Sequence, residues 1–298
     1  MIKPREIRLV LPLLLVILVA SLFPLKAGAP GLLQPVALWP ASAGGLYVLD
    51  RTRGLTYSPS GPGLDLKNSS NFATFSASWQ AVDMAAVHVG SEERVYVLLA
   101  QETTGMLLCY ANRQFTAPSY VAKTLLTGIA PDAQGQRLFL SGGLTNQIFE
   151  FDWSDPHPNP TKVFVTVHGS QYLGPLAYDA DRHVLYATDQ RIGAIFAINT
   201  DSKSVSRVTQ ITGQVSALAF DSVHRTLYAA EAVGRKVWAL AVDKPNAKPL
   251  VFAGSGDFRQ PSAIAIDTNG TLWMGDSESQ TIYRLAPNGT ATSYPLGP

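Results

Sequence analysis

Four acidic residues each stand at the end of a similar apolar stretch, and they are the clearest candidates for binding chemistry. The acids that end these stretches are Asp50, Asp189, Glu231 and Asp276. Carboxylates that gather at one edge of a fold can bind a hard cation or a basic partner, because such cations prefer several oxygen ligands. The alternative is structural: each acid ties the end of its strand to the next hairpin. Both interpretations stay open in the sequence.

Other reactive groups lack the spacing that their chemistry requires. The five histidines are scattered, with neither His-x-His nor His-Glu-x-x-His spacing for a metal ion. No Gly-x-Ser-x-Gly motif places a serine nucleophile at the end of a strand. Cys109 is the only cysteine, so no intrachain disulfide can form. The sequence therefore names no catalytic residue and predicts no metal site.

The elements that would position the four acids recur six times along the chain. The repeated stretches start 49, 43, 47, 42 and 45 residues apart, at Leu46, Val95, Leu138, Leu185, Leu227 and Leu272. A period of about 45 residues with four short strands per unit is typical of propeller blades. We therefore expect an all-β fold, a six-bladed β-propeller over residues 30–298. Each unit begins on an inner strand, so the ring should close by packing between the first and last blades.

The strands of a unit can be placed from turn residues and apolar runs. In the last unit they are expected at Pro261–Ile266, Thr271–Asp276, Thr281–Ala286 and Thr290–Pro295. The fourth strands of the first two units are expected at Phe72–Ala77 and Tyr120–Leu126. The inner strands read as VALW, AAVH, GIAP, PLAY, SALAF and SAIAI. This small and apolar lining favours a binding platform over an enzyme, which would need convergent polar ligands.

The last unit resembles an NHL repeat, whose pattern is P-x-G-I-A-V-D, a short turn, L-Y-V-A-D and an apolar strand with an arginine. The residues at the matching positions are Pro261, Ala265, Asp267, Gly270, Leu272, Asp276, Ile282 and Arg284. All six units share the spacing, and the last one is also specific in sequence. The resemblance implies a platform that binds proteins, or RNA in some eukaryotic members.

A more distant resemblance, by layout, is to the gluconolactonase-like propellers. It implies a calcium-like ion over the central channel, held by a Glu before the first inner strand and by an Asn at the head of inner strands. Here Gln34 stands at the first of these positions, and Gly174, Ser216 and Ser262 stand near the second. With the anionic ligands replaced, lactonase chemistry is the alternative rather than the expectation.

Residues 1–29 read as a signal peptide or a single-pass anchor. Lys3, Arg5 and Arg8 precede an apolar run from Leu9 to Leu25. Its 17 residues are long for a signal core and at the lower edge of a membrane span, so cleavage and retention both stay open. Either way we expect the propeller outside the cytoplasmic membrane, in a bacterial periplasm or cell envelope or in the extracellular space.

The charge distribution argues against nucleic acid as a partner. From residue 30 onward 19 basic and 21 acidic residues leave a net charge of about −2, without a basic run. We therefore expect a monomeric, noncatalytic binding or scaffold module for a protein or a glycan, without a cofactor. The alternative is a metal-dependent hydrolase or lyase of the gluconolactonase-like class, with calcium as its ion.

Overall fold

The computed structural model describes residues 34–42, 44–51, 54–58, 70–73, 78–111, 114–154, 159, 161–244, 246–254, 256 and 258–296. Within these ranges the chain forms 24 strands in six four-stranded antiparallel sheets and no helix. Among these described residues there is no helix that is long and apolar enough to cross a membrane. The predicted signal or anchor, residues 1–29, lies outside the described residues.

The first three blades each use four consecutive strands. Blade one holds β1 (Pro35–Pro40), β2 (Leu46–Asp50), β3 (Gly54–Ser58) and β4 (Ser70–Ala73). Blade two holds β5 (Gln80–Val89), β6 (Glu92–Gln101), β7 (Thr104–Ala111) and β8 (Gln114–Ala122). Blade three holds β9 (Leu126–Asp132), β10 (Arg137–Gly142), β11 (Gln147–Asp152) and β12 (Lys162–Thr166).

The last three blades repeat this order with shorter connections. Blade four holds β13 (Leu173–Asp179), β14 (Val184–Asp189), β15 (Ala194–Asn199) and β16 (Val205–Gln210). Blade five holds β17 (Val215–Asp221), β18 (Thr226–Glu231), β19 (Lys236–Ala241) and β20 (Leu250–Gly254). Blade six holds β21 (Pro261–Ile266), β22 (Leu272–Asp276), β23 (Thr281–Leu285) and β24 (Ala291–Pro295).

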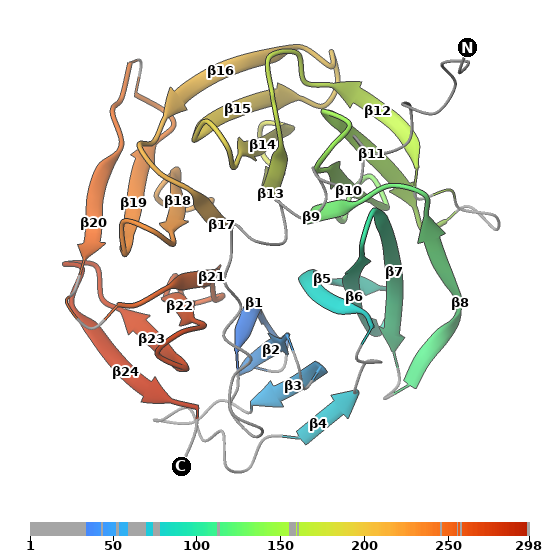
Figure 1. Cartoon of the computed structure of the whole chain (residues 1–298), viewed down its shortest axis with the longest axis horizontal. Coiled ribbons are helices and arrows are strands. Elements are labelled where there is room, and N and C mark those ends of the chain that lie inside the picture. The colour runs from blue at the N-terminus through green and yellow to red at the C-terminus, as the bar shows by residue number, and fades with distance from the viewer. Residues whose placement is uncertain are drawn as a thin grey trace, which may run out of the picture. The chain divides into compact units, whose positions relative to one another are not determined.

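The first strand of every blade faces a common centre. Figure 1 shows β1, β5, β9, β13, β17 and β21 around this centre, and each of them contacts the next, with β21 in contact with β1. Each sheet contains only strands that are consecutive in the chain. The predicted six-bladed propeller is therefore confirmed, and no strand from the C-terminal blade joins the first sheet.

The hydrophobic core is divided into six clusters, one between each pair of neighbouring blades. Middle strands are buried on both faces, as in β10, where Leu138, Phe139 and Leu140 are fully buried. Among the described residues, the cluster between blades two and three holds 13 buried side chains. The cluster that closes the ring, between blades six and one, holds six, among them Leu38 and Ile282. Closure by face packing is confirmed, and this cluster has the fewest buried side chains of the six among the residues that the structure describes.

Two of the expected outer strands were placed too late in the chain. The first, expected at Phe72–Ala77, is β4 at Ser70–Ala73. The second, expected at Tyr120–Leu126, is β8 at Gln114–Ala122. Leu126 instead begins β9, where it pairs with Gly142 and is fully buried between blades two and three. Burial of this leucine at the blade interface fixes the register of the inner strand.

Candidate functional site

Every inner strand carries a β-bulge at the same place, close to where it begins. The register shifts by one residue near the start of each ladder with the second strand, and in β13 the irregularity spans two residues. The residues that the bulges leave unpaired include Val36, Val82, Thr127, Gly174, Ser216 and Ser262. A bulge frees a residue from the ladder and changes the direction of its side chain. The six strands thus present a ring of equivalent positions around the centre.

Hydroxyl groups in this ring connect neighbouring blades. Three of them donate to a backbone oxygen at the start of the next inner strand: Thr127 Oγ1 to Leu173 O at 2.8 Å, Ser216 Oγ to Pro261 O at 2.7 Å and Ser262 Oγ to Pro35 O at 2.6 Å. These partly buried hydroxyl groups have a structural role, because a carbonyl group without a hydrogen-bond partner would be costly. These side chains hold the ring together.

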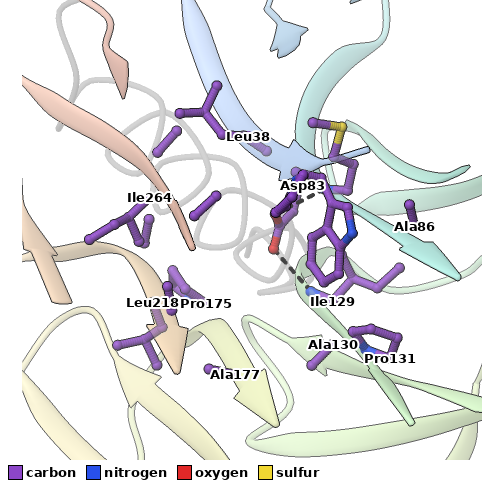
Figure 2. A pocket seen from close by; sticks show the side chains of 18 of the residues that line it. Leu38, Asp83, Ala86, Ile129, Ala130, Pro131, Pro175, Ala177, Leu218 and Ile264 are labelled. Atoms are coloured by element: carbon purple, nitrogen blue, oxygen red, sulfur yellow. Dashed lines mark hydrogen bonds between the residues drawn. The ribbon is translucent and has the colours of Figure 1, made fainter. Parts of the chain in front are cut away.

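The inner strands enclose a central cavity with a volume of about 500 Å³ (Figure 2). All six blades contribute to its wall, which is made mainly of alanine, valine, leucine, isoleucine and proline side chains, including Leu38, Ile129, Pro175, Leu218 and Ile264. This volume and this composition are typical of sites that bind a small ligand or part of a partner. The cavity is the candidate functional site.

Asp83 is the acid within this apolar wall. In the aligned inner strands its position is occupied elsewhere by alanine, glycine or proline, at Ala37, Gly128, Pro175, Ala217 and Ala263. Figure 2 shows the Asp83 carboxyl group among the side chains that line the cavity. Asp83 is thus a single polar group in an otherwise small and apolar ring.

Two backbone groups hold the Asp83 carboxyl in place. Met84 N donates to Oδ1 at 2.9 Å, and Ile129 N, from the neighbouring blade, donates to Oδ2 at 3.1 Å. Burial raises the pKa of Asp83 to about 7, although these two hydrogen bonds act in the opposite direction. The carboxyl group therefore changes its charge close to neutral pH. A cavity group with this property is a candidate for function.

The cavity lining continues past the last residues of the inner strands, where the cavity reaches one face of the propeller. Aromatic side chains from three blades stand at this end: Trp39, Tyr178 and Phe220. Exposed Ser42 and Thr268 complete the lining here. Aromatic rings that are half-buried at the opening of a pocket can contact a ligand without a large loss of side-chain entropy.

Two acids at this end of the cavity already have hydrogen-bond partners. Glu93 accepts from Tyr47 Oη at 2.7 Å and from Ser42 N at 2.9 Å. Asp267 accepts from Trp273 Nε1 at 3.0 Å and from backbone N–H groups of its own turn. Both carboxylates therefore serve to fix the mouth, while they also add negative charge to it.

The four acids predicted from the sequence lie at the opposite ends of the inner strands. Each pairs across the ladder with a residue at the start of its blade, as Asp50 does with Pro35 and Asp276 with Pro261. All four are buried, and none of them lines the cavity. The structure therefore separates them from the candidate site and from one another, one to a blade.

Backbone N–H groups surround two of these carboxylates. Asp189 Oδ1 accepts from Arg191 N and Ile192 N at 2.8 and 3.1 Å, while Oδ2 accepts from Ser170 Oγ at 2.9 Å and from the backbone of residues 171 and 172. Burial would raise the pKa of Asp189, but these hydrogen bonds prevail and lower it. Asp276 accepts in the same manner from four backbone N–H groups at 2.7 to 3.1 Å. These bonds match the structural alternative.

The other two acids also accept hydrogen bonds from groups outside their own strand. Asp50 accepts a hydrogen bond from Gln34 N, and Glu231 Oε2 accepts from Trp238 Nε1 at 2.7 Å. The longer Glu231 side chain fits because glycine stands beside it at Gly213 and Gly234, where a Cβ atom would overlap its carboxylate. A binding role for the four acids stays a prediction. Among the described residues, no three His, Cys, Asp or Glu side chains converge on one metal position.

Comparison with known proteins shows that this chain is similar to other propellers. Residues 168–296, the last three blades, match the SMP-30/gluconolactonase/LRE-like region. A curated relative, protein cueball of Drosophila grimshawi, is 31% identical over 137 residues, which are 43% of this chain and 22% of that protein. The chain thus spans about a fifth of that relative's length. The predicted likeness to six-bladed propellers, including the gluconolactonase-like ones, is confirmed.

Solved structures show the same fold across most of the chain. A propeller in a nidogen/laminin complex superposes with a TM-score of 0.70 and 15% identity, over 82% of this chain and 91% of that one. Virginiamycin B lyase from Staphylococcus aureus superposes with a TM-score of 0.60 and 14% identity, over 90% and 86%. At such identities the likeness is one of fold, which hosts unrelated functions.

The sequence reasoning missed Asp83 because it misaligned one strand. It aligned the second inner strand on Ala85–His88, whereas the ladder with β6 aligns Val82–Ala85 with the other five blades. In that register the six strands read VALW, VDMA, TGIA, GPLA, SALA and SAIA. An acid in a column of alanine, glycine and proline was the signal that could have identified it.

Proposed function

We propose that this chain is an exported, noncatalytic binding module whose central cavity receives part of a protein or glycan partner. The observation that carries this proposal is the cavity of about 500 Å³, with apolar walls and an aromatic opening on one face. Rigid inner strands from six blades build it, so binding requires little reorganisation of the backbone. Monomeric assembly and a bacterial envelope location are part of the same proposal.

A protein partner is supported by one structural neighbour. The nidogen/laminin structure is, by its title, a complex between two proteins, and its propeller superposes on this chain over 82% of its length. The aromatic residues Trp39, Tyr178 and Phe220 at the cavity mouth are of the kind that dominate protein interfaces. Aromatic side chains also stack on sugar rings, which keeps a glycan within the proposal.

The second candidate is a metal-dependent hydrolase or lyase. It is favoured by the match of residues 168–296 to the gluconolactonase-like region. The residues at the ring of bulges fit a calcium ion poorly, because Val36, Val82 and Gly174 offer no side-chain oxygen and the hydroxyl groups of Ser216 and Ser262 donate to backbone carbonyls. We therefore rank this alternative second.

Metal titration separates the two candidates. We expect the purified full chain to show no change in melting temperature and no binding heat with Ca²⁺, Mg²⁺, Mn²⁺ or Zn²⁺. A stoichiometric site of micromolar affinity would stabilise the fold by mass action and would overturn the noncatalytic proposal. In that event the next experiment is an assay of hydrolysis with lactone and ester substrates.

A variant that fills the cavity tests the binding site itself. Ala217 lines the cavity at the position equivalent to Asp83, and it is only partly buried. Ala217→Leu should reduce binding in peptide and glycan array screens at least tenfold, because it occupies the space of the ligand. Asp201 is exposed, and Asp201→Asn is the matched control, which should bind as the unmodified chain does. Equal binding by both variants would place the site elsewhere on the propeller.

A further inference from the structure

The central cavity has charge of one sign. The acids and the histidine that line it are Asp83, His88, Glu93 and Asp267, and none of the described lining residues is a lysine or an arginine. Glu93 and Asp267 are fixed at the mouth by their own hydrogen bonds. A concave site with acids and low-dielectric walls concentrates cations, because the walls focus the electric field.

Asp83 has room for a further hydrogen-bond donor. From the residues that the structure describes, each of its carboxyl oxygens accepts one backbone hydrogen bond, one from Met84 and one from Ile129. An ionised carboxylate offers about four acceptor positions, so about two are left. Figure 2 shows the group facing the interior of the cavity from β5. A donor that carries positive charge would replace the water that this carboxylate loses on burial.

The depth of the cavity sets the shape of its occupant. Asp83 lies near the start of β5, and His88, which lies near its end, also lines the cavity. Five residues of extended strand span about 16 Å. Small and apolar side chains, such as Ala86 and Ile129, cover the wall along this path. A ligand that reaches Asp83 from the mouth must therefore be long and apolar along most of its length.

We propose that the central cavity binds an elongated organic cation, with a protonated amine or guanidinium group at Asp83 and an apolar body along the inner strands. This inference rests on the proposed function and names the ligand class of the same site. A free amine and the basic side chain of a partner peptide share this chemistry. The cationic group is the selective element, because apolar walls alone do not distinguish it from a neutral group of equal shape.

The raised pKa of Asp83 results from burial, which backbone hydrogen bonds partly offset, and no charged group of the surrounding strands is among its causes. The titratable residues of the strands that contact β5 are Tyr47 and Asp50 of β2, Glu92, Glu93, Arg94 and Tyr96 of β6, and Asp132 of β9, while β1 has none. Burial and the two backbone hydrogen bonds account for its raised pKa. A cationic ligand should therefore bind more tightly as pH rises from 6 to 8 and Asp83 loses its proton.

The test uses three probes of matched shape: 4-phenylbutylamine, 4-phenylbutanol and 4-phenylbutyrate. Calorimetric titration of the full chain at pH 8 should give an affinity for the amine at least tenfold higher than for the alcohol, with the butyrate weakest. At pH 6 the advantage of the amine should shrink several-fold. A peptide, acetyl-Leu-Leu-Lys-amide, distinguishes the two sources: tighter binding of the peptide indicates a partner side chain, and tighter binding of the amine indicates a small molecule.

Asp83→Asn should remove the advantage of the amine over the alcohol, while Asp201→Asn should keep it. If Asp83→Asn does not fold, the pH dependence of the unmodified chain decides, since a constant ratio between pH 6 and pH 8 overturns the inference. Equal affinity for amine and alcohol, or no binding of either, also overturns it. If the two bind equally and Ala217→Leu abolishes both, the cavity remains the binding site and only the preference for a cation fails.

Discussion

At the scale of single residues, Asp83 is a cavity-lining acid whose pKa is raised to about 7. Its neighbours at the same level of the ring are small, so the carboxyl group is surrounded by apolar wall instead of by other charges. Desolvation in such surroundings penalises the charged form, and the two backbone hydrogen bonds only partly offset it. The chain therefore maintains at this point an acid that an alanine could replace in the fold.

Asp83 should make the stability of the chain depend on pH. Its pKa is raised from 3.8 to about 7 on folding, so its contribution is fully present below about pH 4 and is lost as pH rises through 7. Relative to Asp83→Asn, the free energy of unfolding of the unmodified chain should fall by on the order of 4 kcal/mol between pH 4 and pH 8. Urea denaturation of both proteins at several pH values measures the difference. Parallel profiles would show that Asp83 titrates normally.

At the scale of elements, the buried acids at the ends of second strands act as ties between a strand and the turns beside it. Asp189 and Asp276 each accept bonds from the segment before the inner strand and from the turn after the second strand. Blades two and three have Leu99 and Gly142 at the equivalent position. Four of the six blades therefore have a carboxylate at this position, and blades two and three have none.

Removing one tie should destabilise its blade. Asp189→Asn keeps the shape but replaces one acceptor by a donor that faces backbone N–H groups, which should cost about 2 to 4 kcal/mol at pH 7. Because the pKa of Asp189 is lowered by these hydrogen bonds, its contribution is present above its unfolded pKa and is lost as pH falls through the lower folded value. The difference in the free energy of unfolding between Asp189→Asn and the unmodified chain should therefore become smaller in strong acid. Denaturant unfolding of Asp189→Asn, with Asp201→Asn as the control, measures this difference. If the unfolding midpoint of Asp189→Asn at pH 7 equals that of the unmodified chain, Asp189 does not stabilise its blade.

At the scale of the whole molecule, the ring closes where its packing is thinnest. The cluster between blades six and one holds six buried side chains among the described residues, fewer than any other cluster. Ser262 adds a bond across this interface, from its Oγ to Pro35 O at 2.6 Å. Ser216 makes the equivalent bond between blades five and six at 2.7 Å. The two serines are matched in chemistry and differ only in the interface that they cross.

Loss of the closing bond should open the ring locally. Ser262→Ala and Ser216→Ala should each lower the free energy of unfolding by about 1 to 2 kcal/mol. Only Ser262→Ala should increase hydrogen exchange in β1, because no described strand of blade six pairs with the sheet of blade one. Hydrogen exchange read by mass spectrometry distinguishes the two variants. Equal protection of β1 in both would mean that the closing interface is no weaker than the others.

The number of blades and the place of most strands follow from the sequence, because each blade repeats a local pattern of apolar runs and turns. The sequence also located Asp50, Asp189, Glu231 and Asp276 correctly at strand ends, since that placement depends on the neighbouring residues alone. The cationic or partner binding predicted for them was drawn from residue type, which does not report how many backbone N–H groups a carboxylate meets. Some of those donors lie in the turn that directly follows the strand, and the others come from loops 16 to 19 residues away.

Which residues share the central cavity depends on how the blades pack in three dimensions. Asp83 and Ile129 are 46 positions apart and meet because β5 and β9 stand side by side around the ring. The bulge in β5 sets the register that brings Asp83 to the level of Ala37 and Ala217, and a shift of one residue would point it elsewhere. Register and ring closure depend on packing between blades, and this packing joins residues that no local pattern connects.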